Sequence, residues 1–399
     1  MDRITARRRA ALFALFLVPG LAISSWVTRT PDIRDAIQAS TAEMGLVLFG
    51  LSVGSMAGIL ASGRLVARFG ARPIVVAGML GVIAAMPIVG LGAALGSPVV
   101  VTAGLAVFGL GMGGGEIAIN VEGADVERII GREVLPMMHG FFSLGTVLGA
   151  VAGIVFTATS VPVVWHLLGI GVLTAALFAS VIRRLGPGVG QQVRVADAPR
   201  APRPAVWRDP RVLLIGAVVL AMARAEGTAN DWLPLVMVDG HGFDPALGSA
   251  VFAAFAASMT VGRFAGGPFL ARFGRARVIQ ASAIIGGLGL AGVIFLDQPV
   301  LAGASVILWG LGASLGFPVA LSAAGDSGPA HESAARVSFV AVVGYVAFLV
   351  GPPTLGFLGE HFGLRHALIA VLALVAVAAV LAPAVGRREP AKVSDITRR

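Results

Sequence analysis

The chain has 399 residues, of which 57% are apolar and only 13% are charged, about half the charge of a soluble domain. With a mean hydropathy of +0.89, it carries more apolar surface than one or two water-soluble cores can bury. The net charge of +9 does not indicate a nucleic-acid partner, because the arginines stand in short clusters between apolar runs, and the lack of cysteine excludes disulfides and thiolate sites.

Apolar runs long enough to cross a bilayer follow one another from the N-terminus. A hydrocarbon core about 30 Å thick needs about 20 helical residues. Arg7, Arg8 and Arg9 precede the first run as in a signal peptide, but the many runs that follow favour a retained helix with a cytoplasmic N-terminus. The first six predicted spans are 10–30, 43–66, 73–95, 98–122, 136–158 and 161–182.

A polar stretch rich in Pro and Arg, 183–210, divides the chain into two parts. It predicts a cytoplasmic linker between an N-terminal six-helix bundle, 1–182, and a C-terminal six-helix bundle, 211–387. A short cytoplasmic tail, 388–399, completes the predicted organisation. The second six predicted spans are 211–237, 245–267, 277–296, 299–323, 335–358 and 364–386.

The distribution of arginine supports this count of spans. With twelve spans and both termini in the cytoplasm, only Arg29, Arg34 and Arg365 fall on the outer side, which satisfies the positive-inside rule. A missed span in either half would scramble that asymmetry. The sequence therefore predicts an all-α, multi-pass integral protein of a bacterial cytoplasmic (inner) membrane, with twelve transmembrane helices.

The two predicted bundles repeat a local pattern. The tetrapeptide ARFG at 67–70 recurs at 271–274. At the same offset, Ser40 with Glu43 forms a capping box before one span, and Asp244 forms an N-cap before another. Two pseudo-equivalent bundles are what alternating access requires, since either end of a central cavity can then open.

Residues 63–72 (GRLVARFGAR) resemble the loop signature of the major facilitator superfamily, and 267–277 resemble its second copy. The resemblance implies two pseudo-symmetric six-helix bundles with a cytoplasmic gate. Ala67 stands where the family usually has an acidic residue, so we expect the following loop to supply other partners for Arg68 and Arg72. These expected partners are Asp125, Glu127 and Arg132. The gate residues that we predict are Gly63, Arg68, Gly70, Arg72, Asp125, Arg132 and Arg272.

Further segments are similar to the superfamily branch of rhizopine-type (inositol-derivative) transporters, near the fucose permeases. They are 25–31 (SWVTRTP), 113–122 (GGGEIAINVE), 139–145 (HGFFSLG), 226–232 (EGTANDW) and 351–353 (GPP). This similarity implies uptake or export of a small polar, sugar- or inositol-like solute. Drug or metabolite efflux by an antiporter remains the alternative, although the predicted fourth span lacks the arginine, and the fifth the Gly-Pro pair, of drug antiporters.

Ionisable side chains within the spans indicate where the chemistry lies, because a charge at bilayer depth usually faces a cavity or a partner. Glu116 and Asn120 share one helical face by their i, i+4 spacing, as do Glu226 and Asn230. The predicted proton-coupling carboxylates are Glu116 and Glu226. The predicted substrate-binding residues are Asn120, Arg224, Asn230, Asp231 and Trp26.

These assignments have structural alternatives. Glu116 could form a hydrogen bond to a neighbouring helix, and Arg224 a buried salt bridge. Trp26 is explained as well by anchoring at the membrane interface. His139 and His166 are expected to be packed or interfacial, with His139 the stronger exception.

The small residues and prolines give two expectations about helix packing. Gly145, Gly149 and Gly153 repeat a spacing that lets helices approach closely. The sequence Gly351-Pro352-Pro353 should break its helix, because each proline removes a backbone donor where no water is available.

The sequence holds no nucleotide-binding loop, nucleophile elbow or zinc motif. We therefore expect no enzymatic activity, no metal and no cofactor. A transporter-like receptor is less favoured, because the tails are too short for a signalling domain. The predicted protein is a secondary active transporter, monomeric, whose partners are a small solute, protons and the lipid bilayer, and not nucleic acid.

Overall fold

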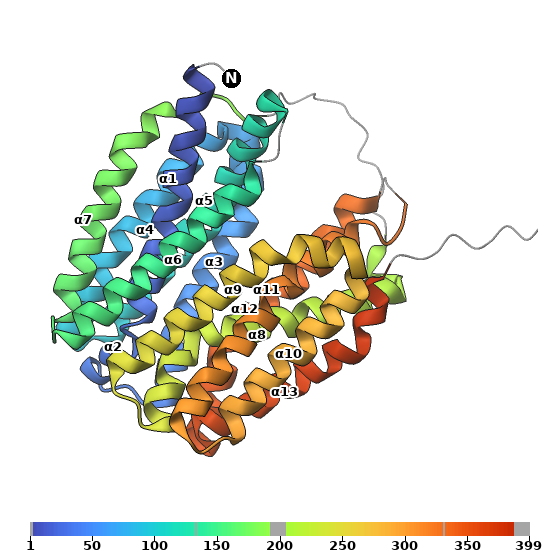
Figure 1. Ribbon diagram of the computed structural model, residues 1–399. Helices are drawn as coiled ribbons and strands as arrows, with labels where there is room; N and C mark the ends of the chain where they lie inside the picture. The colour runs from blue at the N-terminus through green and yellow to red at the C-terminus, as the bar shows by residue number, and fades with distance from the viewer. Residues whose placement is uncertain (1–2, 132–133, 192–204, 330–331, 387–399) are drawn as a thin grey trace, which may run out of the picture.

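The computed structural model describes residues 3–131, 134–191, 205–329 and 332–386 (Figure 1). Across these ranges, twelve helices are long and apolar enough to cross a membrane. The prediction of an all-α protein with twelve transmembrane helices is confirmed. The described ranges leave out part of the predicted linker and the predicted tail.

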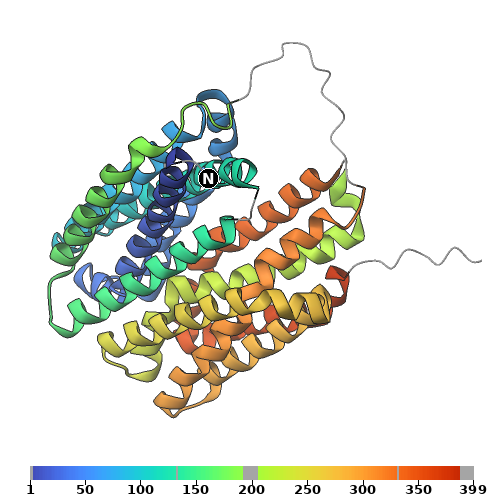
Figure 2. The ribbon, with the colours of Figure 1, turned by 45° about the horizontal axis from the view of Figure 1, so that its top comes forward.

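The helices divide into an N-half and a C-half, which lie beside each other as two bundles (Figure 2). The N-half consists of α1 (Arg3–Val27), α2 (Thr30–Ala36), α3 (Thr41–Phe69), α4 (Ala71–Ala94), α5 (Pro98–Ile130), α6 (Leu135–Ala158) and α7 (Val163–Val181). The C-half consists of α8 (Pro210–His241), α9 (Pro245–Phe273), α10 (Arg275–Phe295), α11 (Pro299–Gly325), α12 (Ser333–Phe362) and α13 (Leu364–Leu381). The 3-10 turns η1 (Ile182–Arg184), η2 (Val206–Arg208) and η4 (Ala382–Val385) flank these bundles.

Helices α3 and α9 show how the repeated sequence pattern becomes repeated structure. Each has 29 residues. The capping box predicted at Ser40 is present, with the Glu43 N–H donating to Ser40 Oγ at 3.3 Å. Asp244 caps α9 by accepting two backbone N–H groups at 3.0 Å. Both helices end at glycines with positive φ, Gly70 at 85° and Gly274 at 76°, a conformation that strains other residues.

Close packing of α1 on α6 depends on glycines, as their spacing predicted. A Cβ at Gly145 would lie 2.3 Å from the carbonyl oxygen of Leu17, and one at Gly20 would lie 2.1 Å from that of Phe142. At both positions the three atoms nearest to the added Cβ belong to the backbone of the other helix, so no side chain separates the two helices there. The expectation that these small residues let helices approach is therefore confirmed for this pair.

The predicted break in the helix at Pro352 and Pro353 is wrong, because α12 runs unbroken from Ser333 to Phe362. Pro352 cannot donate to the carbonyl four residues earlier, that of Phe348. The freed Phe348 oxygen instead accepts a hydrogen bond from Ser52 Oγ on α3, at 3.0 Å. A hydroxyl from the other half thus satisfies the backbone group that the lipid cannot.

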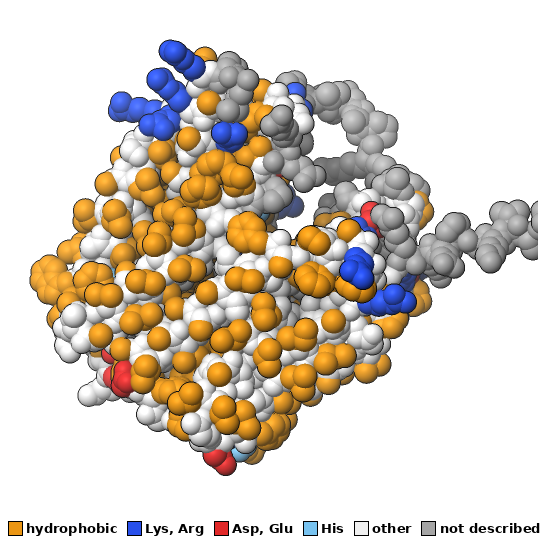
Figure 3. Space-filling model, viewed as in Figure 1, with side chains coloured by type: hydrophobic (Ala, Val, Ile, Leu, Met, Phe, Trp, Pro, Cys, Tyr) orange, Lys and Arg blue, Asp and Glu red, His pale blue; other side chains and the backbone are white. Residues whose placement is uncertain are grey.

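The two halves meet at one end of the molecule and diverge at the other (Figure 1). We call the meeting end, where α2 lies, the closed end, and the end where α1 begins and α7 stops the open end. At the closed end, a Cβ on Gly356 would lie 2.9 Å from the Gly45 Cα of the other half. Arginine side chains gather at the open end, and acidic side chains appear at the closed end (Figure 3).

Candidate functional site: a cavity between the halves

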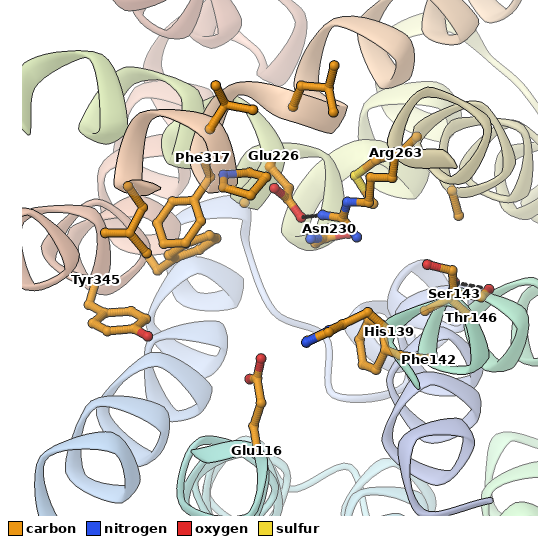
Figure 4. A pocket seen from close by; sticks show the side chains of 18 of the residues that line it. Glu116, His139, Phe142, Ser143, Thr146, Glu226, Asn230, Arg263, Phe317 and Tyr345 are labelled. Atoms are coloured by element: carbon orange, nitrogen blue, oxygen red, sulfur yellow. Dashed lines mark hydrogen bonds and ion pairs between the residues drawn. The ribbon is translucent and has the colours of Figure 1, made fainter. Parts of the chain in front are cut away.

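A cavity of about 1640 Å³ lies between the two halves. Helices α1, α3, α4, α5 and α6 form one wall, and α8, α9, α11 and α12 form the other. Phe273 and Arg275, at the end of α9 and the start of α10, line its mouth at the open end. Its charged side chains at bilayer depth come from both walls (Figure 4).

Glu116 is the charged group of the N-half wall. It follows a run of glycines through which α5 fits tightly against its neighbours: a Cβ at Gly111 would lie 2.5 Å from the Gly78 oxygen of α4, and one at Gly113 would lie 2.5 Å from the Ser55 oxygen of α3. The Glu116 side chain is exposed to the cavity and points into it (Figure 4). It makes no hydrogen bond or ion pair with the residues that the structure describes.

Asn120 lies one turn beyond Glu116 but does not line the cavity within the described residues. Its Nδ2 donates to the Glu116 carbonyl oxygen at 2.9 Å, and its Oδ1 lies 3.1 Å from His139 Nε2. His139 itself lines the cavity, its ring 5.0 Å from that of Phe16 in an edge arrangement. Since Asn120 is occupied by these bonds, the geometry favours a role in holding His139 over direct contact with a solute.

The C-half wall carries an ion pair. Arg263 Nη2 on α9 lies 2.8 Å from Glu226 Oε1 on α8, and Arg263 Nε lies 3.5 Å from the Ser314 carbonyl oxygen. Close packing fixes this position, because a Cβ at the neighbouring Gly262 would lie 2.3 Å from Ser314 Oγ. Glu226 therefore has a fixed counter-ion in its own half, unlike Glu116.

Sequence analysis missed Arg263 and Tyr345. The signal for Arg263 was available, since it is an arginine inside the predicted span 245–267 and the rule that selected Glu116 applies to it equally. Tyr345 is the only tyrosine of the chain and lines the cavity from α12. The sequence of this span alone does not show whether Tyr345 faces the cavity or the lipid.

The other predicted substrate residues divide into two groups. Asn230 and the buried Asp231 line the cavity from α8. Arg224 is not part of the described lining, because its guanidinium is buried and Nη2 donates to the Gly351 carbonyl oxygen at 2.8 Å. Trp26 is also outside it, being only 1% exposed and packed edge-on against Phe108. In this conformation Arg224 and Trp26 lie in packed positions outside the cavity, and their assignment to the substrate site stays a prediction.

A sequence model of the Major Facilitator Superfamily matches residues 11–307 and 232–399. The chain belongs to the Major Facilitator Superfamily. An uncharacterised MFS-type transporter of Yersinia pestis is 28% identical over 374 residues, which cover 93% of this chain and 94% of that protein. The membrane protein MosC of Rhizobium meliloti is 24% identical over 368 residues, 90% of this chain and 85% of MosC.

Solved structures of superfamily transporters share the fold. A variant of the nucleoside transporter NupG has a TM-score of 0.78 at 15% identity, over 95% of this chain and 100% of that chain. FucP in its outward conformation has a TM-score of 0.67 at 16% identity, over 96% of this chain and 100% of that one. The chain is thus a multi-pass membrane protein with the architecture of the superfamily's transporters.

The acidic partners expected for the superfamily loop signature are engaged elsewhere. Asp125 Oδ2 lies 2.7 Å from Arg8 Nη1, and Asp125 Oδ1 lies 2.6 Å from Arg128 Nη2. Glu127 Oε1 accepts two backbone N–H groups at the start of α6. The expectation that these carboxylates pair with Arg68 or Arg72 is therefore wrong in this conformation, because the first turns of α1 bring Arg8 to α5.

The remaining predicted gate residues lie at the open end, on both halves. The Arg68 guanidinium lies 5.0 Å from the Phe69 ring centre, and the repeat-equivalent Arg272 lies 5.3 Å from that of Phe273. Gly63 faces open space and Gly70 holds the positive φ that ends α3. Arg132 lies outside the described residues. A gate at these positions stays a prediction, since the halves do not meet there.

Proposed function

We propose that the chain is a secondary active transporter that moves a small, neutral, hydroxyl-rich solute by alternating access, with Glu116 as the proton-coupling group. The observation that carries this proposal is the unpaired Glu116 carboxylate, which faces a cavity that is sealed at one end and accessible from the other. A carboxylate in a cavity of low dielectric can bind and release a proton as its access to water changes. A carboxylate buried without any access to water could not exchange its proton and so could not couple transport to a proton gradient.

The polar groups of the C-half wall suit a polyol. The Glu226–Arg263 pair, Asn230 and Asp231 offer acceptors and donors on one side of the cavity. Aromatic rings, among them Phe142, can cover the apolar face of a sugar or inositol ring. Two structural neighbours are named for hydroxylated solutes, a nucleoside and fucose, which agrees with this choice.

The charge of the cavity disfavours an anionic solute. At bilayer depth its lining holds three carboxylates, on Glu116, Glu226 and Asp231, against one guanidinium, that of Arg263, within the described residues. A second arginine, Arg275, lies at the mouth. A carboxylate or phosphate on the solute would thus meet a net negative wall.

The arginine-rich open end should face the cytoplasm of a bacterial inner membrane, by the positive-inside rule. The conformation described here is then the inward-open state of the transport cycle. We keep the predicted assignments of proton coupling to Glu116 and of solute contact to Asn230 and Asp231. Glu226 was predicted to be a second proton-coupling carboxylate, and we propose that it contacts the solute instead, because Arg263 already pairs with it. A monomer suffices, since one chain builds the whole cavity.

Proteoliposomes with an imposed proton gradient test this function. Purified protein would be screened against radiolabelled sugars, inositols and amino sugars, and the accumulated solute followed over time. Glu116→Gln should abolish accumulation driven by the gradient but retain exchange of solute between the two sides. Asp297→Asn is the matched control, because Asp297 is an exposed carboxylate at the closed end that pairs only within the C-half, and it should accumulate solute as the native protein does.

Gradient-driven accumulation by Glu116→Gln at the native level would overturn the coupling role. The alternative function, efflux of a drug or metabolite by antiport, predicts the opposite dependence on the gradient. In that case the solute would leave the lumen against an inward flow of protons. Reversing the gradient in the same vesicles separates the two directions.

A further inference from the structure

Arg263 is the only guanidinium that lines the described cavity at bilayer depth, and it is held from one side only. One of its terminal nitrogens binds Glu226, while no hydrogen-bond partner is present for Nη1 among the described residues. Its side chain is 33% exposed, against 15% for Glu226. The cation therefore keeps free donors toward the cavity, although its partner carboxylate is largely covered.

Glu116 faces this cation from the opposite half (Figure 4). The two groups are near enough to interact electrostatically, as are Glu116 and Glu226. The other titratable groups that line the described cavity at bilayer depth are Tyr345 on α12, His139 on α6 and Asp231 on α8. Helices α3 and α4 contribute only serines, methionines and aliphatic side chains. Arg263 is the one fixed positive charge in this set.

One cation cannot neutralise two carboxylates. While Glu116 is protonated, the Arg263–Glu226 pair is balanced within the C-half. When Glu116 loses its proton, a second negative charge competes for the same guanidinium from across the cavity. In a medium of low dielectric, that attraction acts between two rigid bundles and favours bringing α5 and α9 together.

We infer that Arg263 is a positioning residue that transmits the charge of Glu116 to the C-half: it is the shared counter-ion of Glu226 in its own half and Glu116 in the other. This inference rests on the proposed function and adds to it the element that couples the proton to movement. Ionised Glu116 then favours closure of the open end, and protonated Glu116 favours the inward-open state described here.

The absence of cysteine from the chain allows a direct test with spin labels. Arg64→Cys on α3 and Arg277→Cys on α10 place labels on exposed positions of the two halves at the open end. The distance between the two labels would be measured between about pH 5 and pH 9, because carboxyl groups in surroundings of low dielectric can titrate as high as about pH 8–9. Raising the pH should increase the closed-to-open population ratio by about 5- to 150-fold, the usual size of coupling between sites.

Three variants locate the effect. Glu116→Gln should show no pH response and should keep, at every pH, the larger open population that the native protein has at low pH. Arg263→Gln should lose the pH response, and Arg263→Lys should retain part of the response because it keeps the charge. In the Glu116→Gln background, Arg263→Gln should cause no further change in pH response, since two residues that act together are not additive.

Loss of the ion pair could also affect folding, and the variant Glu226→Gln/Arg263→Gln addresses this point by removing both charges together. Its thermal stability and elution profile would be compared with those of the native protein. A native pH response in this folded double variant, with coupling still abolished by Glu116→Gln, would overturn the role of Arg263 and leave the proposed function intact. Native coupling in Glu116→Gln would instead remove the proposed function itself.

Discussion

The two ends of the molecule differ in whether their polar interactions join the two halves or stay within one half. At the closed end the halves bind each other: Ser52 Oγ donates to the Phe348 oxygen at 3.0 Å, and Ser249 Oγ donates to the Thr28 oxygen at 2.9 Å. Arg34 of the N-half also forms an ion pair with Asp239 of the C-half there. At the open end, ion pairs lie within a half. The pairs are Arg8 with Asp125 in the N-half, and Arg275 with Asp326 and Arg336 with Asp209 in the C-half.

The comparison identifies the interactions that must break when the two halves move relative to each other. Separation of the halves at the open end leaves no charge of these pairs without its partner. Separation at the closed end must break the ion pair between Arg34 and Asp239 and the hydrogen bonds to backbone oxygens. Each such bond contributes about 0.5–1.5 kcal/mol, so a few of them set the balance between the two states.

The largest effect is expected from Gly45→Leu, which acts on a close backbone contact between the halves at the closed end. A Cβ at Gly45 would lie 2.8 Å from the Pro352 oxygen and 3.0 Å from the Gly356 Cα, both backbone atoms that cannot move aside. Overpacking costs about 1–3 kcal/mol. Initial rates of solute uptake should therefore fall by about tenfold or more, because 1.4 kcal/mol is a factor of ten.

Gly169→Leu is the control for this substitution. Gly169 is also a helical glycine of the N-half, but a Cβ there meets no atom within 4 Å. This variant should transport at the native rate. Equal rates for the two variants would show that the halves do not need to meet at Gly45.

The sequence was sufficient for those features that depend on neighbours along the chain. Apolar runs located every span, and the local caps at Ser40 and Asp244 fixed where α3 and α9 begin. Glu116 was found by the same kind of argument, since its position in a span alone makes it exceptional. Each of these inferences needs only the period and composition of one helix.

Features that depend on a second helix were missed or assigned wrongly. The prolines of α12 do not break it, because Ser52 of the other half satisfies the freed carbonyl group. Asp125 binds Arg8, which lies more than a hundred residues away in the chain. In this conformation Trp26 lies in a packed core and not at the cavity, because the rotation of α1 depends on the helices around it. No spacing within one segment specifies these partners.

A smaller effect is expected from Ser52→Ala, which leaves the Phe348 oxygen at the closed end without its donor. The closed-end contact should weaken by about 0.5–1.5 kcal/mol, the net contribution of one hydrogen bond. The population should move toward opening at that end by about two- to tenfold. Spin labels on exposed positions of the closed end, Leu95→Cys and Phe362→Cys, would measure this change.

Ser180→Ala is the matched control, since Ser180 donates only to the Leu177 oxygen of its own helix, at 2.7 Å. It should leave the distance distribution unchanged. Ser52→Thr, which keeps the hydroxyl group, should retain most of the native population. If Ser52→Ala and Ser180→Ala gave the same distribution, the bond between the halves would contribute nothing to sealing.

The smallest effect concerns an ion pair of the open end. Arg336 Nη1 donates to Asp209 Oδ2 at 2.6 Å, and this hydrogen bond holds the pKa of Asp209 below its usual range. A carboxylate with a depressed pKa in the folded state adds stability that is fully present above its unfolded pKa of about 3.9, and that stability is lost as the pH falls toward the folded value. Asp209→Asn keeps the N-cap of α8, because asparagine caps as well as aspartate, and so removes the ion pair alone.

Asp209→Asn should lower the free energy of unfolding by less than about 1 kcal/mol at pH 5 to 8, since the carboxylate is partly exposed and screened. The deficit relative to the native protein should shrink as the pH is lowered from 4 to 3 in thermal or denaturant unfolding. Because the pair lies within the C-half, the variant should transport solute at the native rate, unlike Gly45→Leu. A deficit that stays constant down to pH 3 would contradict the role of Arg336, and a loss of transport without a loss of stability would show that the ion pairs of the open end take part in the movement between states.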